Sequence, residues 1–545
     1  MSIIATEKWI IAKVKTAMPC KTYLAEKILL ISMFCILSAD ALAAGSPVIY
    51  PFQKADKYVP HNKIDVIIME ALRGKGAQST NLCSDAVFIR RVYLDVTGTL
   101  PQIEDVRRFL ENPRSDKRET LINTLLKQKE FSEYGSLKWC DLLRVKAEFP
   151  INLWPNAVQA YHRWIQDAIA YNMPYDQFVR EMLTSSGSNF RVPQVNFYRA
   201  IQGQEPSSIA NAVVLTFMGA RFENWPKVKQ DGMAAFFSRV SYKGTAEWKE
   251  EIVYLNPAPA DSLKAVFPDG TAAKIKQDQD PREVFAEWLT ASENPWFARN
   301  IVNRIWSWLL GRGIIHEPDD IRPNNPPVYP ELLTYLEKEL VKSEYDLLHI
   351  YRQILNSRTY QQSSIPHPDT KDAEKLFACY PVRQLEAEVL IDALCQISGT
   401  RESYSSPIPE PFTFIPPEHR TISLADGSIT SQFLEMFGRP SRDTGLESER
   451  NVQPTEAQRR HMLNSTHIQK KIEQGWRLKN LVRKSRGNPK NLANSLYLTI
   501  LSRYPTEFER QAVEDYFKTK DIKFNQAAID LAWALINSKE FLYRH

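Results

Sequence analysis

The chain has 545 residues, of which 43% are apolar, and its 69 Lys and Arg against 64 Asp and Glu give a formal net charge of +5. A chain of this length can bury several hydrophobic cores. The charges are spread along the sequence without a basic block, which gives no reason to expect nucleic-acid binding. The 34 prolines against 19 glycines favour helices joined by stiff loops over a hairpin-rich sheet.

The first residues have the pattern of an export signal. Lys21 and Lys27 precede the apolar run 28–37, and small residues follow up to Ala43. This order predicts a signal peptide over residues 1–43 and a periplasmic or extracellular location. The apolar run is short for a membrane span of about 20 residues, so an uncleaved signal is the one route to membrane attachment that the sequence offers.

Four cysteines remain after the predicted signal, namely Cys83, Cys140, Cys379 and Cys395. An oxidising compartment allows disulfides, and four cysteines permit three pairings. Buried free thiols are the alternative in a chain of this size. No Cys-x-x-Cys occurs anywhere in the sequence.

The chain beyond residue 43 divides by texture into four parts. A lead-in covers residues 44–80, and helical spacing of apolar residues then continues over 81–245. Residues 246–280 contain short runs at 252–255, 265–267 and 272–275 that read as strands, with a Pro-Asp-Gly turn at 268–270, which predicts a small β insert. Helical spacing resumes over 281–545. The expected fold is therefore mainly α, with two multi-helical regions separated by the insert.

Helix limits follow from caps, prolines and glycines. Outside the strongest helix, described next, the expected helices cover residues 64–72, 88–98, 102–110, 118–126, 136–145, 157–171, 175–183, 208–218, 231–239, 330–341, 347–355, 384–397, 456–472, 491–501, 507–517 and 527–537. A proline-rich stretch at 404–417 predicts a surface loop, in which Phe412, Phe414 and Ile415 can dock on the body.

The strongest helix signal lies at residues 294–311. Asn294 can accept hydrogen bonds from the free amides of the first turn, and Gly311 suits a left-handed C-cap. Apolar residues three or four apart predict one buried face, and Trp306 widens it. The face consists of Phe297, Ile301, Ile305, Trp308 and Leu309.

Four polar residues lie on or beside this face, namely Arg299, Asn300, Asn303 and Arg304. Buried arginines and asparagines must find hydrogen-bonding partners, and Asp319, Asp320 or Glu283 could supply them. We interpret the four as a structural polar network, with a ligand pocket as the alternative.

Candidates for chemistry are few. His316, Asp319 and Asp320 form a cluster that could bind a divalent cation, although such clusters more often cap the next element. Asp319, Asp320 and Glu223 are the candidate catalytic acids of a hydrolase, but the sequence does not show which carboxylates converge.

Histidines and tryptophans add two weaker signals. His461 and His467 are six residues apart, a spacing that does not put both on one face of a helix. Exposed indoles can stack on sugar rings, and four tryptophans at loops or helix edges are candidates, although most tryptophans in a helical protein are core. They are Trp154, Trp225, Trp296 and Trp306.

Several motifs carry a resemblance to a known family. The segment Phe-Ile-Arg-Arg-Val-Tyr-Leu-Asp-Val-Thr-Gly-Thr-Leu-Pro at 88–101, with 173–180 and 234–237, resembles the domain of unknown function fifteen-forty-nine. The segments 288–304, 311–313, 325–327, 354–360 and 537–541 resemble its companion, fifteen-fifty-three. This pair is typical of cytochrome-associated proteins abundant in planctomycetes and related bacteria.

One departure from the family shapes the functional expectation. Many members carry a Cys-x-x-Cys-His segment shortly after a phrase similar to residues 217–221, and this chain has none there. We therefore expect no cofactor and no metal. The sequence favours a non-catalytic interaction or scaffold protein of the cell envelope, whose partner is an envelope protein or a glycan. The alternatives are an exported hydrolase acting on polysaccharide or another polymer, and a redox partner protein.

Overall fold

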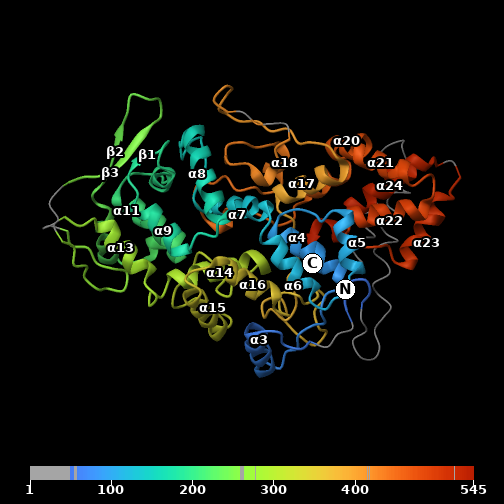
Figure 1. The fold of residues 1–545 in the computed structure, drawn as a ribbon, viewed down its shortest axis with the longest axis horizontal. Coiled ribbons are helices and arrows are strands. Elements are labelled where there is room, and N and C mark those ends of the chain that lie inside the picture. Colours follow the sequence, from blue (N-terminus) through green and yellow to red (C-terminus); the bar gives the residue numbers. More distant parts are fainter. Residues whose placement is uncertain are drawn as a thin grey trace.

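The computed structural model describes residues 49–54, 58–257, 263–276, 278–413, 415, 418–520 and 522–545. The predicted signal peptide and Phe414 lie outside these residues. Within them the fold is mainly α-helical with two small antiparallel sheets, as the sequence predicts (Figure 1). No helix in the described ranges is both long enough and apolar enough to cross a lipid bilayer.

The first half of the chain is a series of short helices joined by tight turns. Ser84 caps the second of these by accepting from the amide of Val87, and the helix ends just before Gly98, which has a positive φ of 61°. The helices are α3 Lys63–Gly74, α4 Asp85–Val96, α5 Ile103–Glu111, α6 Lys117–Leu125, α7 Lys129–Leu142, α8 Trp154–Ala170, α9 Tyr175–Thr184, α10 Asn196–Arg199, α11 Pro206–Val213 and α12 Lys227–Ala234.

The second half continues in the same way and ends in a group of helices at the right of Figure 1. Its helices are α13 Pro281–Thr290, α14 Phe297–Leu310, α15 Pro330–Lys342, α16 Leu347–Asn356, α17 Ala387–Ser398, α18 Gln432–Met436, α19 Glu456–Asn464, α20 Thr466–Gln474, α21 Trp476–Lys484, α22 Pro489–Ile500, α23 Glu507–Phe517, α24 Phe524–Ile536 and α25 Lys539–Leu542.

The strands differ in part from the sequence prediction. β3 Glu251–Leu255 was expected, but it pairs with β2 Val240–Gly244 and β1 Gly187–Ser188, which were not. The expected strands near 265–275 reduce to one bridge between Val266 and Ala272. The reason is packing, because the amide of Val266 donates to the carbonyl of Gly232 and this segment lies against α12 instead of joining the sheet. The second sheet pairs β4 Arg383–Gln384 with β5 Tyr543–Arg544.

Helix α14 lies in the core, as its apolar pattern predicts. All the residues of its expected face are buried, and Trp306 is fully buried as well. Asn294 accepts from the amides of Trp296 and Phe297 at 3.0 and 3.1 Å in the turn before the helix. The helix itself begins later than predicted, at Phe297, with Trp296 at the N-cap position and no side-chain cap. Gly311 ends the helix at a φ of 72°, the left-handed conformation expected of it.

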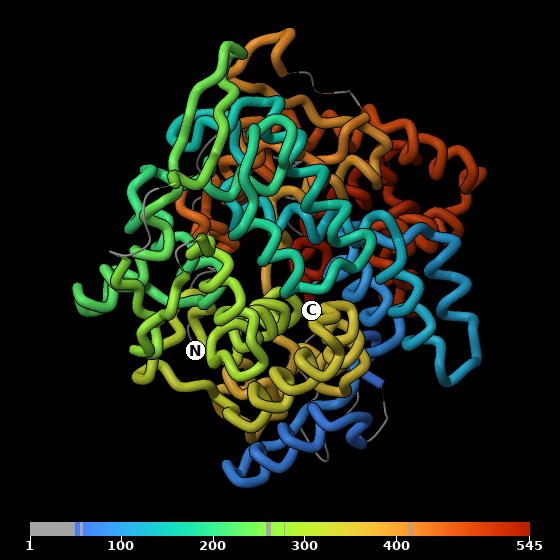
Figure 2. The backbone as a smooth tube through the Cα atoms, turned by 60° about the vertical axis from the view of Figure 1, so that its left-hand side comes forward, coloured from blue at the N-terminus to red at the C-terminus, as the bar shows by residue number. Residues whose placement is uncertain are grey.

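The C-terminus lies in the middle of the molecule, enclosed by segments far from it in sequence (Figure 2). Arg91 of α4 donates to the carbonyl of His545 at 2.9 Å, and Arg90 donates to the carbonyl of Phe541 at 3.0 Å. A second hydrophobic cluster likewise combines Leu94 and Leu137 with helices of the last 160 or so residues. The first and last parts of the chain therefore share one interior.

Buried ion pairs join the same parts. Asp95 of α4 accepts from Arg383 at 2.8 Å, and its other oxygen accepts from the hydroxyl groups of Tyr360 and Tyr380. Farther along, Lys138 donates to Glu386 at 2.9 Å. Such pairs fix geometry, because each buried charge is costly when its partner is removed.

Candidate functional site

The predicted acid Asp319 belongs to a closed network instead of an open site. One carboxylate oxygen accepts from Arg304 at 2.6 Å, and the other accepts from the backbone amide of Glu447 at 2.7 Å. The Arg304 guanidinium also donates to Asn300, and the Trp308 indole donates to the Glu447 carboxylate at 3.1 Å. Asp319 is fully buried, so this arrangement leaves no access for a substrate.

The other two members of the predicted network lie on either side of it. The buried side chain of Asn303 bonds both the carbonyl and the amide of Ile315, at 3.0 and 2.8 Å. Arg299 lies apart, on a half-exposed surface, where it pairs with Glu337 at 2.7 Å. Asn303 and Arg304 thus hold the segment after α14 in place, and Asn300 ties α14 to the carbonyl of Thr216. Arg299 braces α14 against α15.

The remaining predicted acids do not converge with Asp319. Asp320 pairs with Arg322 at 3.1 Å, and His316 lies 3.7 Å from Glu317. Glu223 is exposed on the 3-10 turn Phe222–Asn224. Within the described residues no group of three or more His, Cys, Asp or Glu is arranged to hold a metal ion. The four described cysteines are free thiols.

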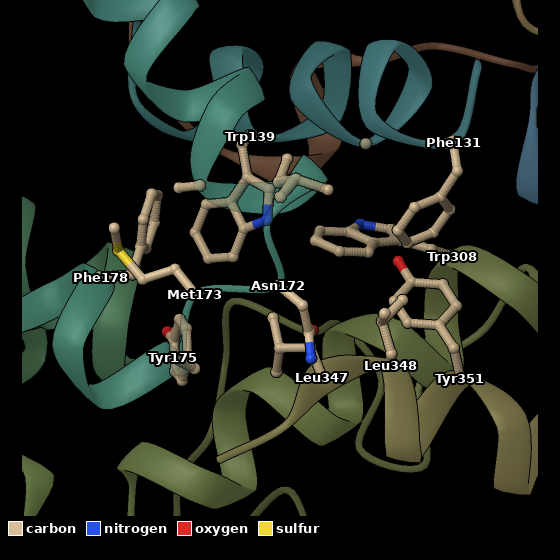
Figure 3. Close-up of a pocket in the computed structure, with 13 residues that line it drawn as sticks. Phe131, Trp139, Asn172, Met173, Tyr175, Phe178, Trp308, Leu347, Leu348 and Tyr351 are labelled. Atoms are coloured by element: carbon tan, nitrogen blue, oxygen red, sulfur yellow. The ribbon is translucent and has the colours of Figure 1, made fainter. Parts of the chain in front are cut away.

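An apolar cavity lies between α7, α9, α14 and α16 (Figure 3). Trp139 and Trp308 face each other across it edge to face, with ring centroids 6.1 Å apart. Its one amide side chain, Asn172, already donates to Asp346 at 2.9 Å. The free volume is about 40 Å³, far below the roughly 300 Å³ of a typical small-molecule site. This cavity is a packing gap in the aromatic core.

A larger cleft of about 580 Å³ opens between α5 and the start of α7 on one side and α17 and α21 on the other. It is therefore built from both halves of the chain. Amide and hydroxyl side chains, which can both donate and accept hydrogen bonds, line it from either side. They are Thr99, Gln102, Gln128, Gln396 and Thr400.

The charged groups of this polar cleft are largely paired with one another. Arg401 lies 2.9 Å from Glu418, and Arg420 pairs with Glu133. Asp105 accepts from the hydroxyl of Tyr93 at 3.3 Å. Because these charges compensate one another, we expect a ligand to be held in the cleft by hydrogen bonds rather than by net charge.

Among the aromatic residues that line the polar cleft, Trp476 is the exposed one. Its side chain is 59% exposed, and the guanidinium of Arg477 lies 5.4 Å from the ring centroid. Gly399, in the left-handed conformation after α17, allows the indole to approach, since a Cβ there would lie 2.5 Å from the indole nitrogen. The adjoining Gly475 also packs closely, against the carbonyl of Ser398. One edge of the indole therefore lies against the backbone of Gly399, while the ring remains solvent-exposed.

Two carboxylates of the polar cleft have shifted pKa values. Burial raises the pKa of Asp392 to about 6, even though its oxygens accept from the backbone amides of Thr421 and Ile422. Burial also acts to raise the pKa of Glu402, but His467 and Lys471 outweigh it and hold that pKa below its usual range. A carboxyl group that titrates near pH 6 and one that is ionised well below neutral pH therefore line the same cleft.

The histidine pair shows a clear difference from the sequence prediction. The expected single helix over 456–472 is broken at Ser465, whose hydroxyl caps α20 by accepting from the amide of Ile468. The break turns the chain, so His461 Nε2 and His467 Nδ1 lie 3.3 Å apart. His467 also bonds Glu402 at 3.0 Å. The six-residue spacing argument assumed an unbroken helix and was wrong for that reason.

The tryptophans named from sequence are not the exposed ones. Trp306 is fully buried, and Trp154 is partly covered by Phe412 at a centroid distance of 5.5 Å. Trp225 and Trp296 are partly buried, and the ammonium of Lys229 lies 4.1 and 5.7 Å from their ring centroids. Trp476 was missed, and the available signal was the Gly-Trp pair followed by a run of basic residues.

The fold and the polar cleft define a mainly helical protein in which both halves of the chain line one polar cleft, with Trp476 exposed in its lining. The family described as PSCyt2, protein of unknown function (DUF1549), matches residues 63–238. The family described as PSD1, protein of unknown function (DUF1553), matches residues 281–517. The chain belongs to the proteins that carry these two domains in this order. No curated protein and no solved structure matches it.

Proposed function

We propose that this is an exported cell-envelope protein that binds a neutral carbohydrate chain in the polar cleft, by recognition without catalysis. The observation that carries the proposal is that an exposed indole, Trp476, and several amide and hydroxyl side chains line the same cleft. Sugar rings present an apolar face that stacks on an aromatic ring and hydroxyl groups that both donate and accept. The cleft supplies both kinds of contact.

Charge and size support a neutral sugar over other ligands. Arg401 and Arg420 face Glu418 and Glu133, which compensates their charge, and Arg477 donates to the carbonyl of Gln396. A volume of about 580 Å³ lies within the roughly 300–1,000 Å³ of small-ligand sites. This is room for a few sugar units of a longer chain, and the open cleft lets the chain continue beyond it.

A hydrolase acting on the same ligand is the second candidate, favoured by Asp392. Its pKa of about 6 would let it act as an acid near neutral pH, and Glu402 is the ionised carboxylate in the same cleft. The catalytic acids expected from sequence were elsewhere, at Asp319, Asp320 and Glu223. Of these, Asp319 is fully buried, whereas Asp392 lines the cleft although both its oxygens accept backbone amides.

The test is a glycan array probed with the purified protein, followed by reducing-end analysis of the glycans bound. Binding without release of new reducing ends supports the carbohydrate-binding proposal. Release of reducing ends that is lost in Asp392→Asn supports the hydrolase. Failure to bind any neutral glycan at millimolar concentration contradicts both.

A further inference from the structure

A second concave surface lies on the far side of α21 from the polar cleft. It is a groove of about 540 Å³ bounded by α20, α21, α22 and α24. Its floor is apolar and recessed, with Ile472, Leu478 and Leu496 at most 4% exposed. Lys479 and Arg483, one helical turn apart on α21, form a rim along it.

The rim lies in a segment that is locally rich in positive charge, although the charges are spread evenly over the sequence as a whole. Between residues 470 and 490 there are eight lysines and arginines against one acidic residue, Glu473, which also lines the groove. Five of these are exposed and form no ion pair with any described carboxylate, and they are Lys479, Arg483, Lys484, Arg486 and Lys490. Arg483 has one polar partner, the neutral Asn480 at 2.8 Å.

The neighbouring helices offer a contrast, since Arg503 is matched by Glu509 and Glu540, each at 2.7 Å. Clustered like charges repel one another, which disfavours the folded state slightly unless an acidic partner relieves it. An apolar groove edged by such charges has the charge pattern of a binding surface for an acidic, apolar ligand.

We propose that this groove binds an amphipathic helix of a partner protein, with an apolar stripe flanked by Glu or Asp. The walls are helices and offer no free strand edge, so the helix-in-groove mode fits them and strand addition does not. The charge complementarity of Lys479 and Arg483 selects an acidic helix. A flat lipid surface fits less well, because the apolar floor residues are recessed below the charged rim.

The test uses a fluorescent 18-residue peptide with leucines at i, i+3, i+4 and i+7 and glutamates beside them. We expect anisotropy to show saturable binding, and we expect the double substitution K479E/R483E to weaken it at least ~10-fold. The matched control K243E/K274E reverses two exposed lysines on and near the β insert and should leave binding unchanged. A peptide with lysines in place of the glutamates should not bind.

Three results would overturn the proposal. They are absence of binding, equal binding of the basic peptide, and equal loss in K243E/K274E. If the protein instead sediments with phosphatidylglycerol vesicles, loses this association in K479E and does not bind the peptide, the rim is assigned to a membrane surface. The inference is independent of the carbohydrate proposal, since Trp476→Ala should not change peptide binding.

Discussion

Replacing Asp319 by Asn tests whether its network is structural or catalytic. The substitution keeps the size of the side chain but removes the charge that faces Arg304 at 2.6 Å. Arg304 is fully buried, and its second carboxylate, Glu447, lies farther away at 3.4 Å. Leaving a buried charge without its main partner costs about 3–5 kcal/mol.

That cost translates into a modest but measurable change in melting temperature. A cooperative unit of roughly 500 residues has an unfolding entropy near 1 kcal/mol/K, so about 4 kcal/mol lowers Tm by about 4 °C. Differential scanning calorimetry measures the shift, with Asp320→Asn on the half-exposed neighbour as the control, for which we expect less than about 1 °C. An unchanged Tm in Asp319→Asn would refute a structural role for the network. Unchanged glycan binding in the folded variant is also expected.

Three further predictions concern the polar cleft and the response to pH. Gly399→Ala places a Cβ 2.5 Å from the Trp476 indole nitrogen at a φ of +76°. We expect the free energy of unfolding to fall by about 1 kcal/mol and the free energy of glycan binding, measured by calorimetric titration, to weaken by more than that. The pKa of Asp392 is about 6 in the folded protein and 3.8 ordinarily. The contribution of its protonated form to folding stability is therefore fully present below pH 3.8 and is lost as the pH rises through 6. Urea unfolding should therefore show Asp392→Asn gaining up to about 3 kcal/mol relative to wild type between pH 4 and pH 7, and a constant difference would contradict the shift. Burial lowers the pKa of His162 to about 4, so wild type should lose up to about 3 kcal/mol relative to His162→Gln as pH falls from 6.5 to 4.

Much of the helical framework could be predicted because its signals are local. The end of α14 follows from Gly311, whose capping role needs only neighbouring residues, whereas its start lies three residues beyond Asn294. The apolar spacing between them identified a core helix correctly. The recognition of the two domains was also correct, because their motifs are long and continuous in sequence.

What escaped prediction depends on contacts distant in sequence. The strand β2 exists because β3 lies beside it, and its residues carry little periodic signal of their own. The break at Ser465 had a local cap, but whether a helix uses an internal cap depends on what packs on either side. The polar cleft combines residues about 300 positions apart, such as Leu100 and Gln396, which share a hydrogen bond at 2.9 Å. No spacing rule connects such positions.

Isothermal titration with cellohexaose, xylohexaose, mannohexaose and chitohexaose tests the central claim most directly. The comparison is between wild type, Trp476→Ala and the matched control Trp248→Ala. Trp248 is 71% exposed and has Lys249 near its ring at 5.6 Å, so it has a similar local setting away from the polar cleft. We predict that at least one hexaose binds, and that Trp476→Ala loses at least ~10-fold in affinity, about 1.4 kcal/mol, while Trp248→Ala binds normally. Equal affinities for all three proteins, or no binding to wild type, would contradict the account.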